Sequence, residues 1–184
     1  MNIRLKSIFL SFLVSIGFIV TMPAFVQAQT SPSLPTATFE NTILTLVNSD
    51  RTAQGVSALT ENSLLAAAAQ AKANDMATEG YFAHYSPSGT SPWYWFTLVG
   101  YYYTHAGENL AINFDDPTAV ETAWMASPSH RANIVRGLYT QTGIGIAHGT
   151  YLGKPATFIV QLFATPALPL VKVNKPSTIA MKTF

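Results

Sequence analysis

The stretch Thr157-Phe-Ile-Val-Gln-Leu-Phe-Ala164 is apolar on both of the faces that a β-strand presents. Because successive side chains of a strand point to opposite faces, such a strand must be covered on both sides. A second strand is predicted from Tyr139 to Ala147, where Ile144 and Ile146 alternate with glycines. Residues 149–155 join the two stretches and are predicted to form the connection of a hairpin.

Four helices are predicted before this hairpin, from apolar periodicity and from residues that favour helix ends. They begin after Thr38, at Asn62 or Ser63, at Trp93 and at Asp116-Pro117. They end near Thr52 to Gly55, at about Thr78 with Gly80 as the stop, at Val99 and before Pro128. Residues 101–113 are expected to include a short strand or extended segment. Helices followed by a late hairpin indicate an α+β domain in which helices pack over a central, mainly antiparallel sheet.

The first 28 residues have the pattern of an export signal. Arg4 and Lys6 supply a positive start, residues 7–22 are mostly apolar, and Val26-Gln27-Ala28 offers small residues for cleavage. The alternative is an uncleaved anchor, but an apolar run of sixteen residues is shorter than the roughly 20 that a spanning helix needs. We therefore predict a signal peptide at 1–28, a flexible lead-in at 29–37, a folded domain at 38–165 and a loose C-terminal tail at 166–184.

The charge balance of the chain argues against several classes of partner. The chain carries ten Lys and Arg residues against nine Asp and Glu residues, and loss of Arg4 and Lys6 with the signal would leave eight against nine. Because no basic cluster is present, neither nucleic acid nor an anionic membrane surface is an expected partner. No apolar run after the signal is long enough to span a membrane, and the chain has no cysteine. An exported domain of this kind must be stabilised by packing alone rather than by disulfides.

Three polar clusters interrupt apolar sequence and indicate a site. His84 lies in Tyr81-Phe-Ala-His-Tyr-Ser-Pro87, His130 lies in Trp124-Met-Ala-Ser-Pro-Ser-His-Arg-Ala-Asn-Ile134, and Glu108 lies between them. Polar groups in an apolar environment cost free energy unless they are paired. We therefore expect the three clusters to converge in the fold.

Five stretches resemble, in the same order, those of the CAP superfamily of cysteine-rich secretory proteins, antigen 5 and pathogenesis-related 1 proteins. The resemblance covers about Asn41 to Thr165 and is nearer to the bacterial extracellular branch, whose domains are called SCP-like. The stretches are Val47-Asn48 with Arg51, Phe82-Ala83-His84 with Ser86-Pro87, Ala106 to Ala111, Trp124 to Ile134, and Gly143-Ile144-Gly145. The resemblance implies an α-β-α sandwich and a secreted bacterial protein of the cysteine-free type.

The family cleft usually holds two histidines and two acidic residues. The resemblance assigns the first histidine and first acid to His84 and Glu108, and the second histidine to His130. The place of the second acid in many eukaryotic members is occupied here by Ser127. Glu121 lies about one helical turn before Trp124 and could partly replace the missing carboxylate. The alternative, which we favour, is that Glu121 is a solvated helix residue.

Metal binding is expected to be weak at such a cleft. His84 and His130 could share zinc or another divalent ion, but stable sites have three or four ligands. Glu108 could be a third ligand, a partner that fixes a histidine tautomer, or a structural residue that accepts backbone hydrogen bonds. No cofactor is required by any of these interpretations. His105 and His148 lack comparable sequence context and are predicted to lie at the surface.

We therefore expect a secreted binding or interaction module whose cleft contains His84, Glu108 and His130, together with Ser127 and Glu121 as further candidates. Its ligand would be an extracellular cell-wall, protein or lipid component. One alternative is a hydrolase that uses the same cleft, either with a metal or with Ser127 as nucleophile, although Ser127 precedes a proline and resembles a turn residue. Another is a lipid- or sterol-binding protein with an apolar groove beside the aromatic segment 93–103.

Overall fold

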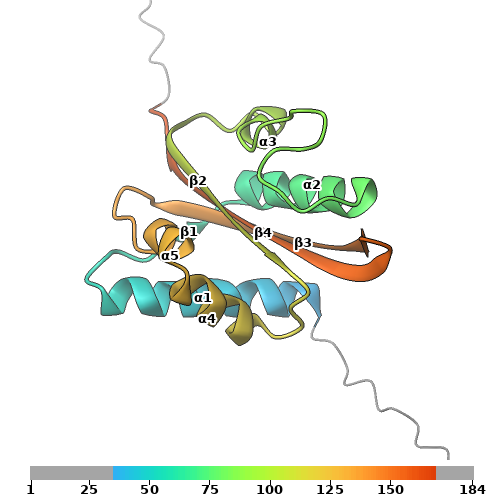
Figure 1. Ribbon diagram of the computed structural model, residues 1–184. Coiled ribbons are helices and arrows are strands. Elements are labelled where there is room, and N and C mark those ends of the chain that lie inside the picture. Colours follow the sequence, from blue (N-terminus) through green and yellow to red (C-terminus); the bar gives the residue numbers. More distant parts are fainter. Residues whose placement is uncertain (1–34, 169–184) are drawn as a thin grey trace, which may run out of the picture. The chain divides into compact units, whose positions relative to one another are not determined.

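The computed structural model describes residues 35–168, whose helices and strands are labelled in Figure 1. The helices are α1 (Thr36–Ala53), α2 (Ser63–Glu79), α3 (Tyr94–Leu98), α4 (Pro117–Ala126) and α5 (Pro128–Ile134). The strands are β1 (Thr60–Glu61), β2 (Tyr103–Ile112), β3 (Gln141–Tyr151) and β4 (Lys154–Pro166). The predicted signal peptide, residues 29–34 of the predicted lead-in, and residues 169–184 of the predicted tail lie outside the described residues.

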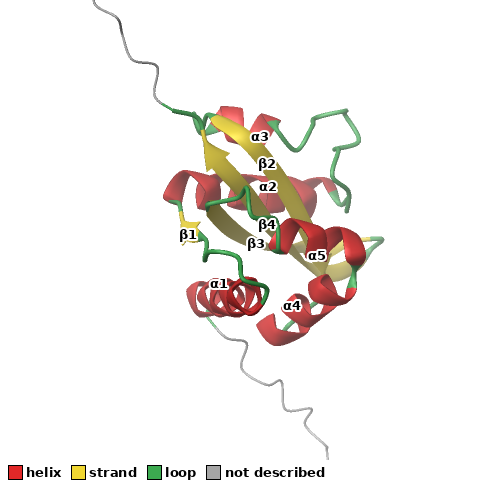
Figure 2. Cartoon of the chain, turned by 90° about the vertical axis from the view of Figure 1, so that its left-hand side faces the viewer, coloured by secondary structure: helices red, strands yellow, loops and turns green. Residues whose placement is uncertain are grey.

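The four strands form one sheet in the order β1-β3-β4-β2. β4 pairs antiparallel with both β3 and β2, and the two-residue β1 runs parallel to β3. Helices α2 and α3 lie over one face of the sheet, and α1, α4 and α5 lie over the other face (Figures 1 and 2). The predicted α+β fold, with helices packed over a mainly antiparallel sheet, is therefore confirmed.

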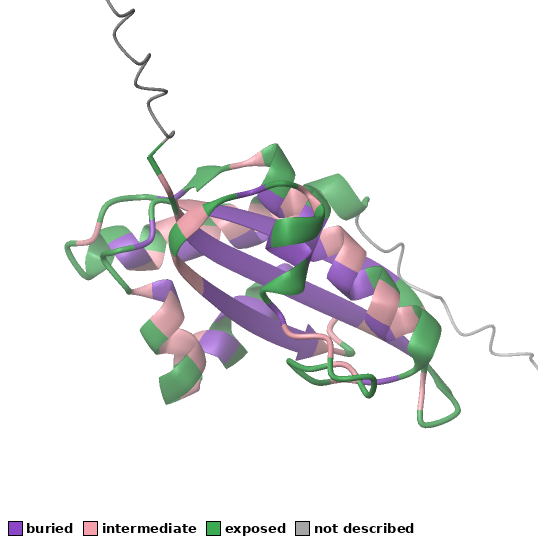
Figure 3. Cartoon of the chain, turned by 90° about the horizontal axis from the view of Figure 1, so that it is seen from above, coloured by how far each residue is buried: buried purple, intermediate pink, exposed green. Residues whose placement is uncertain are grey.

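Each face of the sheet has its own apolar core. On the α2 face, Phe158 and Leu162 of β4 pack in a cluster that includes Leu65 and Met76. On the other face, the alternate β4 residues Ile159 and Phe163 pack in a cluster whose members include Ile43, Val47 and Trp124. The central strands are buried along most of their length (Figure 3). This alternation is the reason that residues 157–164 are apolar on both faces.

Three glycines of β3 let α2 pack directly on the sheet. A Cβ atom added at Gly143, Gly145 or Gly149 would lie 2.1, 2.2 or 2.4 Å from backbone atoms of α2. Real Cβ atoms do not approach other atoms this closely, because van der Waals repulsion rises steeply below contact distance. The glycine face predicted beside Ile144 and Ile146 therefore sets the separation between helix and strand.

The capping residues predicted from the sequence adopt the expected geometry. The Asn62 side chain accepts hydrogen bonds from the backbone N–H groups of Leu64 and Leu65 at the start of α2. Gly80 ends that helix in the left-handed conformation, with φ of 70°. Asp116 accepts a bond from the Thr118 N–H at the start of α4. These contacts satisfy backbone groups that a helix end otherwise leaves unpaired.

Several boundaries differ from the sequence predictions. α1 begins at Thr36, inside the predicted lead-in, and β2 is a ten-residue strand rather than a short one. β4 extends to Pro166, and the hairpin turn consists of Leu152 and Gly153, both with positive φ, instead of residues 149–155. β1 and α5 were not predicted. β1 has only two residues, which are too few to show the alternation of a strand. α5 starts at Pro128, which was interpreted as a helix stop although proline also suits the first helical turn.

Candidate functional site

His84, Glu108 and His130 come from three elements that meet along the edge strand β2. His84 lies in the loop after α2, Glu108 lies in β2, and His130 lies in α5. Glu108 and Asn109 are neighbours in β2, so their side chains point to opposite faces. Glu108 bonds His84 on the α2 face, and Asn109 bonds the backbone of His130 on the other face. The three residues therefore lie around the edge of the sheet, and we refer to them together as the candidate cleft.

The central contact of the cleft joins His84 Nδ1 to Glu108 Oε1 at 2.6 Å. The Glu108 side chain is only 2% exposed, whereas that of His84 is 54% exposed. The hydrogen bond to Glu108 raises the pKa of the His84 imidazole, although partial burial and the positive charge of Lys72 act in the opposite direction. Because Nδ1 is bonded to the carboxylate, Nε2 is the ring nitrogen of His84 that is left to contact a ligand.

The pKa of the His130 imidazole is shifted in the opposite direction to that of His84. Burial lowers the pKa of its imidazole, and the nearby charge of His84 lowers it further. The cleft therefore combines one imidazole that binds a proton more readily than usual with one that binds it less readily. Environments that separate two pKa values in this way provide one group as a proton donor and the other as a neutral acceptor or metal ligand.

Buried polar contacts fix α5 against β2. Asn109 Nδ2 donates to the His130 carbonyl oxygen at 3.2 Å, and Asn133 Nδ2 donates to the Glu108 carbonyl oxygen at 3.0 Å. The two asparagines also bond each other at 2.9 Å. The buried guanidinium of Arg51 donates from Nη1 to the Ile134 carbonyl oxygen at 2.7 Å, at the C-terminal end of α5 where a cation is favourable. These contacts determine where His130 lies relative to Glu108.

A small hollow adjoins His130. It has a volume of ≈ 260 Å³, and Phe82, Leu110 and Trp124 are among the apolar residues that line it with Ser127 and His130. The indole N–H of Trp124 donates to the Leu110 carbonyl oxygen at 3.0 Å, and the Trp124 side chain is 2% exposed. The histidine end of the cleft therefore continues into an apolar surface of limited size.

A comparison with models of known protein families identifies the family of this chain. The family model described as CAP, the cysteine-rich secretory protein family, matches residues 44–163. The chain belongs to the CAP family. The matched segment contains His84, Glu108 and His130, and the observed layers of helix, sheet and helix agree with the α-β-α sandwich expected from the resemblance.

Two bacterial relatives of this chain come from Bacillus subtilis strain 168. The uncharacterised protein YkwD is 36% identical over 121 residues, which cover 65% of this chain and 47% of YkwD. The uncharacterised membrane protein YlbC is 33% identical over 115 residues, which cover 62% of this chain and 33% of YlbC. The chain thus spans less than half the length of either relative.

Solved structures with the same fold include bacterial surface and extracellular proteins. An extracellular protein with an SCP domain from Bacillus anthracis strain Ames has a TM-score of 0.60 at 26% identity, covering 73% of this chain and 45% of that chain. An outer surface protein of Borrelia burgdorferi has a TM-score of 0.63 at 18% identity, covering 74% and 98%. The second similarity shows the fold alone. Between residues 35 and 168, no helix combines the length and the hydropathy needed to cross a membrane.

Ser127 and Glu121, the candidates for the second family acid, differ in their surroundings. Ser127 ends α4 and precedes α5, and its Oγ lies 3.4 Å from Ser129 Oγ. Among the hydrogen bonds of residues 35–168, none joins Ser127 to His130. Ser127 therefore lines the hollow beside His130 without the contact that would activate a serine nucleophile.

Glu121 is buried, so the prediction of a solvated helix residue is wrong. Its residue is 8% exposed, and it interacts with Asp50 of α1. Burial raises the pKa of Glu121 to about 7, and the neighbouring Asp50 carboxyl group contributes to the increase. The error arose because a lone glutamate in a helix is usually exposed, and the partner lies more than seventy residues away in the sequence.

The donor set of the cleft fits a metal ion only in part. In the described part of the chain, no group of three or more His, Asp or Glu side chains is arranged to hold a metal ion. His84 and His130 supply two imidazoles. Glu108 bonds Nδ1 of His84, as a carboxylate does when it supports a histidine that ligates a metal through its other ring nitrogen. Two protein ligands are compatible with weak binding but not with a closed structural site.

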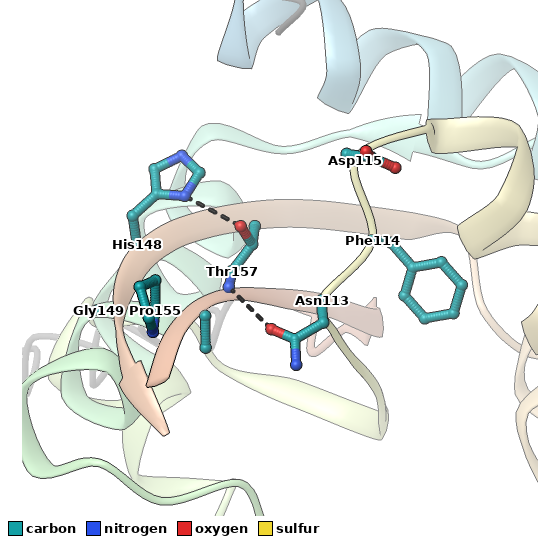
Figure 4. Close-up of a pocket in the computed structure, with 8 residues that line it drawn as sticks. Asn113, Phe114, Asp115, His148, Gly149, Pro155 and Thr157 are labelled. Carbon is teal, nitrogen blue, oxygen red and sulfur yellow. Dashed lines mark hydrogen bonds between the residues drawn. The ribbon is translucent and has the colours of Figure 1, made fainter. Parts of the chain in front are cut away.

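The remaining histidines and aromatic residues lie elsewhere. Figure 4 shows a hollow beside residues 113–115, which follow β2. In it, His148 Nδ1 lies 3.1 Å from Thr157 Oγ1, and Asn113 Oδ1 accepts from the Thr157 N–H at 3.4 Å. None of the three cleft residues lines that hollow. In the aromatic segment, Trp95 and Tyr101 are buried, whereas Tyr94 and Tyr102 are exposed. The aromatic segment thus contributes both to the core and to its rim.

Proposed function

We propose that this CAP domain is a secreted extracellular binding module whose ligand contacts His84 and His130 above a buried Glu108. The observation that carries the proposal is the 2.6 Å contact between His84 Nδ1 and Glu108 Oε1. A buried carboxylate that bonds Nδ1 fixes the orientation of the imidazole and directs Nε2 to the side where a ligand can reach it. The orientation of a binding group is therefore set before the ligand arrives.

The ligand class that we propose to test is a weakly held divalent ion such as zinc. His84 and His130 would be its protein ligands, and Glu108 would support His84 as the hydrogen-bonded carboxylate. Other positions around the ion would be completed by solvent or by an extracellular partner, so the ion is not a required cofactor. Imidazoles ligate metals only when neutral, and the raised pKa of His84 makes binding fall earlier on acidification than at an ordinary histidine.

Export is the second element of the proposal. The signal pattern of residues 1–28, with Arg4, Lys6 and the Val26-Gln27-Ala28 site, supports it. The description of the Bacillus anthracis structure as an extracellular protein gives independent support, because that protein shares the domain at 26% identity. The working place of the domain is then the cell exterior, where cell-wall, protein and lipid ligands are available.

Isothermal calorimetry with Zn²⁺ tests the binding proposal. The wild type is expected to bind one ion weakly, the variant with both His84→Ala and His130→Ala to bind none at this site, and Glu108→Gln to lose about 10–100-fold in affinity. His148→Ala is the matched control, because His148 is exposed and outside the cleft. Equal affinity in the wild type and the double variant would show that the ion binds elsewhere.

A parallel assay separates the module from a serine hydrolase. The hydrolase requires a nucleophile and a base that act as a unit, so its turnover of an ester or peptide must disappear in both Ser127→Ala and His130→Ala. We expect no turnover in the wild type, because Ser127 does not bond His130. Turnover that is lost in both folded variants would replace the binding module with the enzyme.

A further inference from the structure

Lys72 of α2 is fully buried beneath the loop that carries His84. Its residue is 0% exposed, and its ammonium donates to the His84 carbonyl oxygen and to the Tyr81 hydroxyl, both at 3.0 Å. The ammonium also lies over the aromatic rings of Tyr81 and Trp95, at 4.8 and 5.9 Å from their centroids. The Tyr81 hydroxyl in turn donates to a carboxylate oxygen of Asp75.

A buried lysine at this position costs free energy of folding unless its positive charge interacts with another group. Among the described residues, the one ion pair within 4.0 Å joins His84 to Glu108, so no carboxylate directly contacts Lys72. An ammonium removed from water without a close counter-ion is strongly destabilising, and an apolar side chain of similar length would avoid that cost. The site is otherwise lined by aromatic rings, which would accept such a side chain.

The charges that face Lys72 connect it to the cleft. Glu108 acts on it from β2 and Asp75 from its own helix, and both oppose the lowering of the Lys72 pKa by burial. Glu108 Oε1 bonds His84, whereas Glu108 Oε2 is buried and has no hydrogen-bond partner within residues 35–168. The Glu108 carboxylate thus lies between the imidazole of His84 and the field of a buried ammonium, with one oxygen still unpaired.

We propose that Lys72 is the positioning residue of the His84–Glu108 pair: its ammonium ties the backbone at His84 to α2 and so holds the imidazole against Glu108. The proposal deepens the proposed function, because it concerns the same cleft. The bond to the His84 carbonyl oxygen holds the segment from which the imidazole projects. Loss of this bond would release the loop from α2 and weaken the contact between His84 Nδ1 and Glu108 Oε1.

The direct test is NMR of the histidine rings at pH 7 in the mature chain and in two Lys72 variants, because the Nδ1–H resonance of His84 reports its bond to Glu108. Lys72→Gln can keep a hydrogen bond to the His84 carbonyl oxygen but loses the charge, and Lys72→Met loses both. Lys72→Gln is expected to keep the wild-type Nδ1–H resonance of His84, whereas Lys72→Met is expected to shift it, because only Lys72→Met loses the bond to the His84 carbonyl oxygen. His148 is the internal reference and Lys154→Met, at an exposed turn, is the matched control.

The outcomes distinguish a positioning role from packing alone. A folded Lys72→Met protein whose His84 Nδ1–H resonance is the same as in the wild type would overturn the proposal. If Lys72→Met fails to fold, Lys72→Leu decides the question by the same measurement. Zn²⁺ affinity at pH 7 is expected to fall by about tenfold in Lys72→Met, in the range of outer contacts to a ligating histidine. A wild type that binds no zinc would overturn the proposed metal site, while the Nδ1–H resonance of His84 would still decide the role of Lys72.

Discussion

Glu121 of α4 interacts with Asp50 of α1, and this contact joins two carboxyl groups at the buried boundary between the helices. Like charges at close range cannot both be ionised without cost, so one proton is shared or retained by the pair. Glu121 Oε1 is buried and has no hydrogen-bond donor as a partner among the described residues. The pair lies on the α1 side of α4 and takes no part in the cleft.

The acid pair makes stability depend on pH. The pKa of Glu121 is raised from 4.5 to about 7, so its protonated form stabilises the fold fully below about pH 4.5, and this contribution is lost as the pH rises through about 7. Glu121→Gln is neutral throughout and should therefore be more stable than the wild type at pH 8, with little difference at pH 4. Urea denaturation from pH 4 to pH 8 measures the free energy of unfolding of the two proteins. Glu79→Gln is the control, because Glu79 is exposed. A constant difference between wild type and Glu121→Gln at all pH values would contradict the buried pair.

Trp124 should be the most sensitive aromatic position on the α4 face. It is 2% exposed and bonds the Leu110 carbonyl oxygen, so Trp124→Ala removes both packing and a hydrogen bond. We expect a loss of about 3–5 kcal/mol in the free energy of unfolding. Trp93→Ala is the control, because Trp93 is 37% exposed and should cost much less. Equal losses in chemical denaturation would contradict this assignment of the core.

The glycine contacts of β3 give a sharper test of packing. Gly145→Ala would place a methyl group 2.2 Å from the Gln70 backbone nitrogen and should destabilise the domain by about 3 kcal/mol, the upper end of the usual cost of overpacking. Gly137→Ala is the matched control, because nothing lies within 4 Å of its added Cβ. Thermal unfolding should thus separate the two alanine variants clearly. A Gly145→Ala protein as stable as Gly137→Ala would show that α2 does not rest on β3 as described.

Export predicts a defined N-terminus. Cleavage after Ala28 removes Arg4, Lys6 and the apolar run, so secreted protein should begin at Gln29. N-terminal sequencing of protein recovered outside the cell measures this directly. Recovery of Met1 on the secreted protein would show that the segment is retained.

The parts of the fold that could be predicted from the sequence are those with a local signal. Asn62 and Gly80 predicted the ends of α2 because capping geometry depends on nearby residues. The apolar run of β4 predicted a strand covered on both faces, since burial on each side requires it. α5 was missed because its first residue, Pro128, suits both a helix start and a helix stop, and β1 is too short for any pattern.

The polar interactions of the site join residues that are far apart in the sequence, so local patterns could not predict them. His84, Glu108 and His130 were singled out by their motifs, but the direction of the Glu108 carboxylate toward His84 Nδ1 is a tertiary feature. The burial of Glu121 could not be predicted, because its partner Asp50 lies in another helix. Lys72 was also not predicted, since a lysine in an alanine-rich helix is usually interpreted as an exposed residue.

The central claim is that His84 and His130 form one binding site, and a Zn²⁺ titration followed by NMR of the four histidine rings tests it most directly. The rings of His84 and His130 are expected to shift together and to saturate at the same zinc concentration, with coordination through Nε2 of His84. His105 and His148 serve as internal controls and should not respond in that range. Shifts confined to His105 or His148, or independent responses of His84 and His130, would contradict the account.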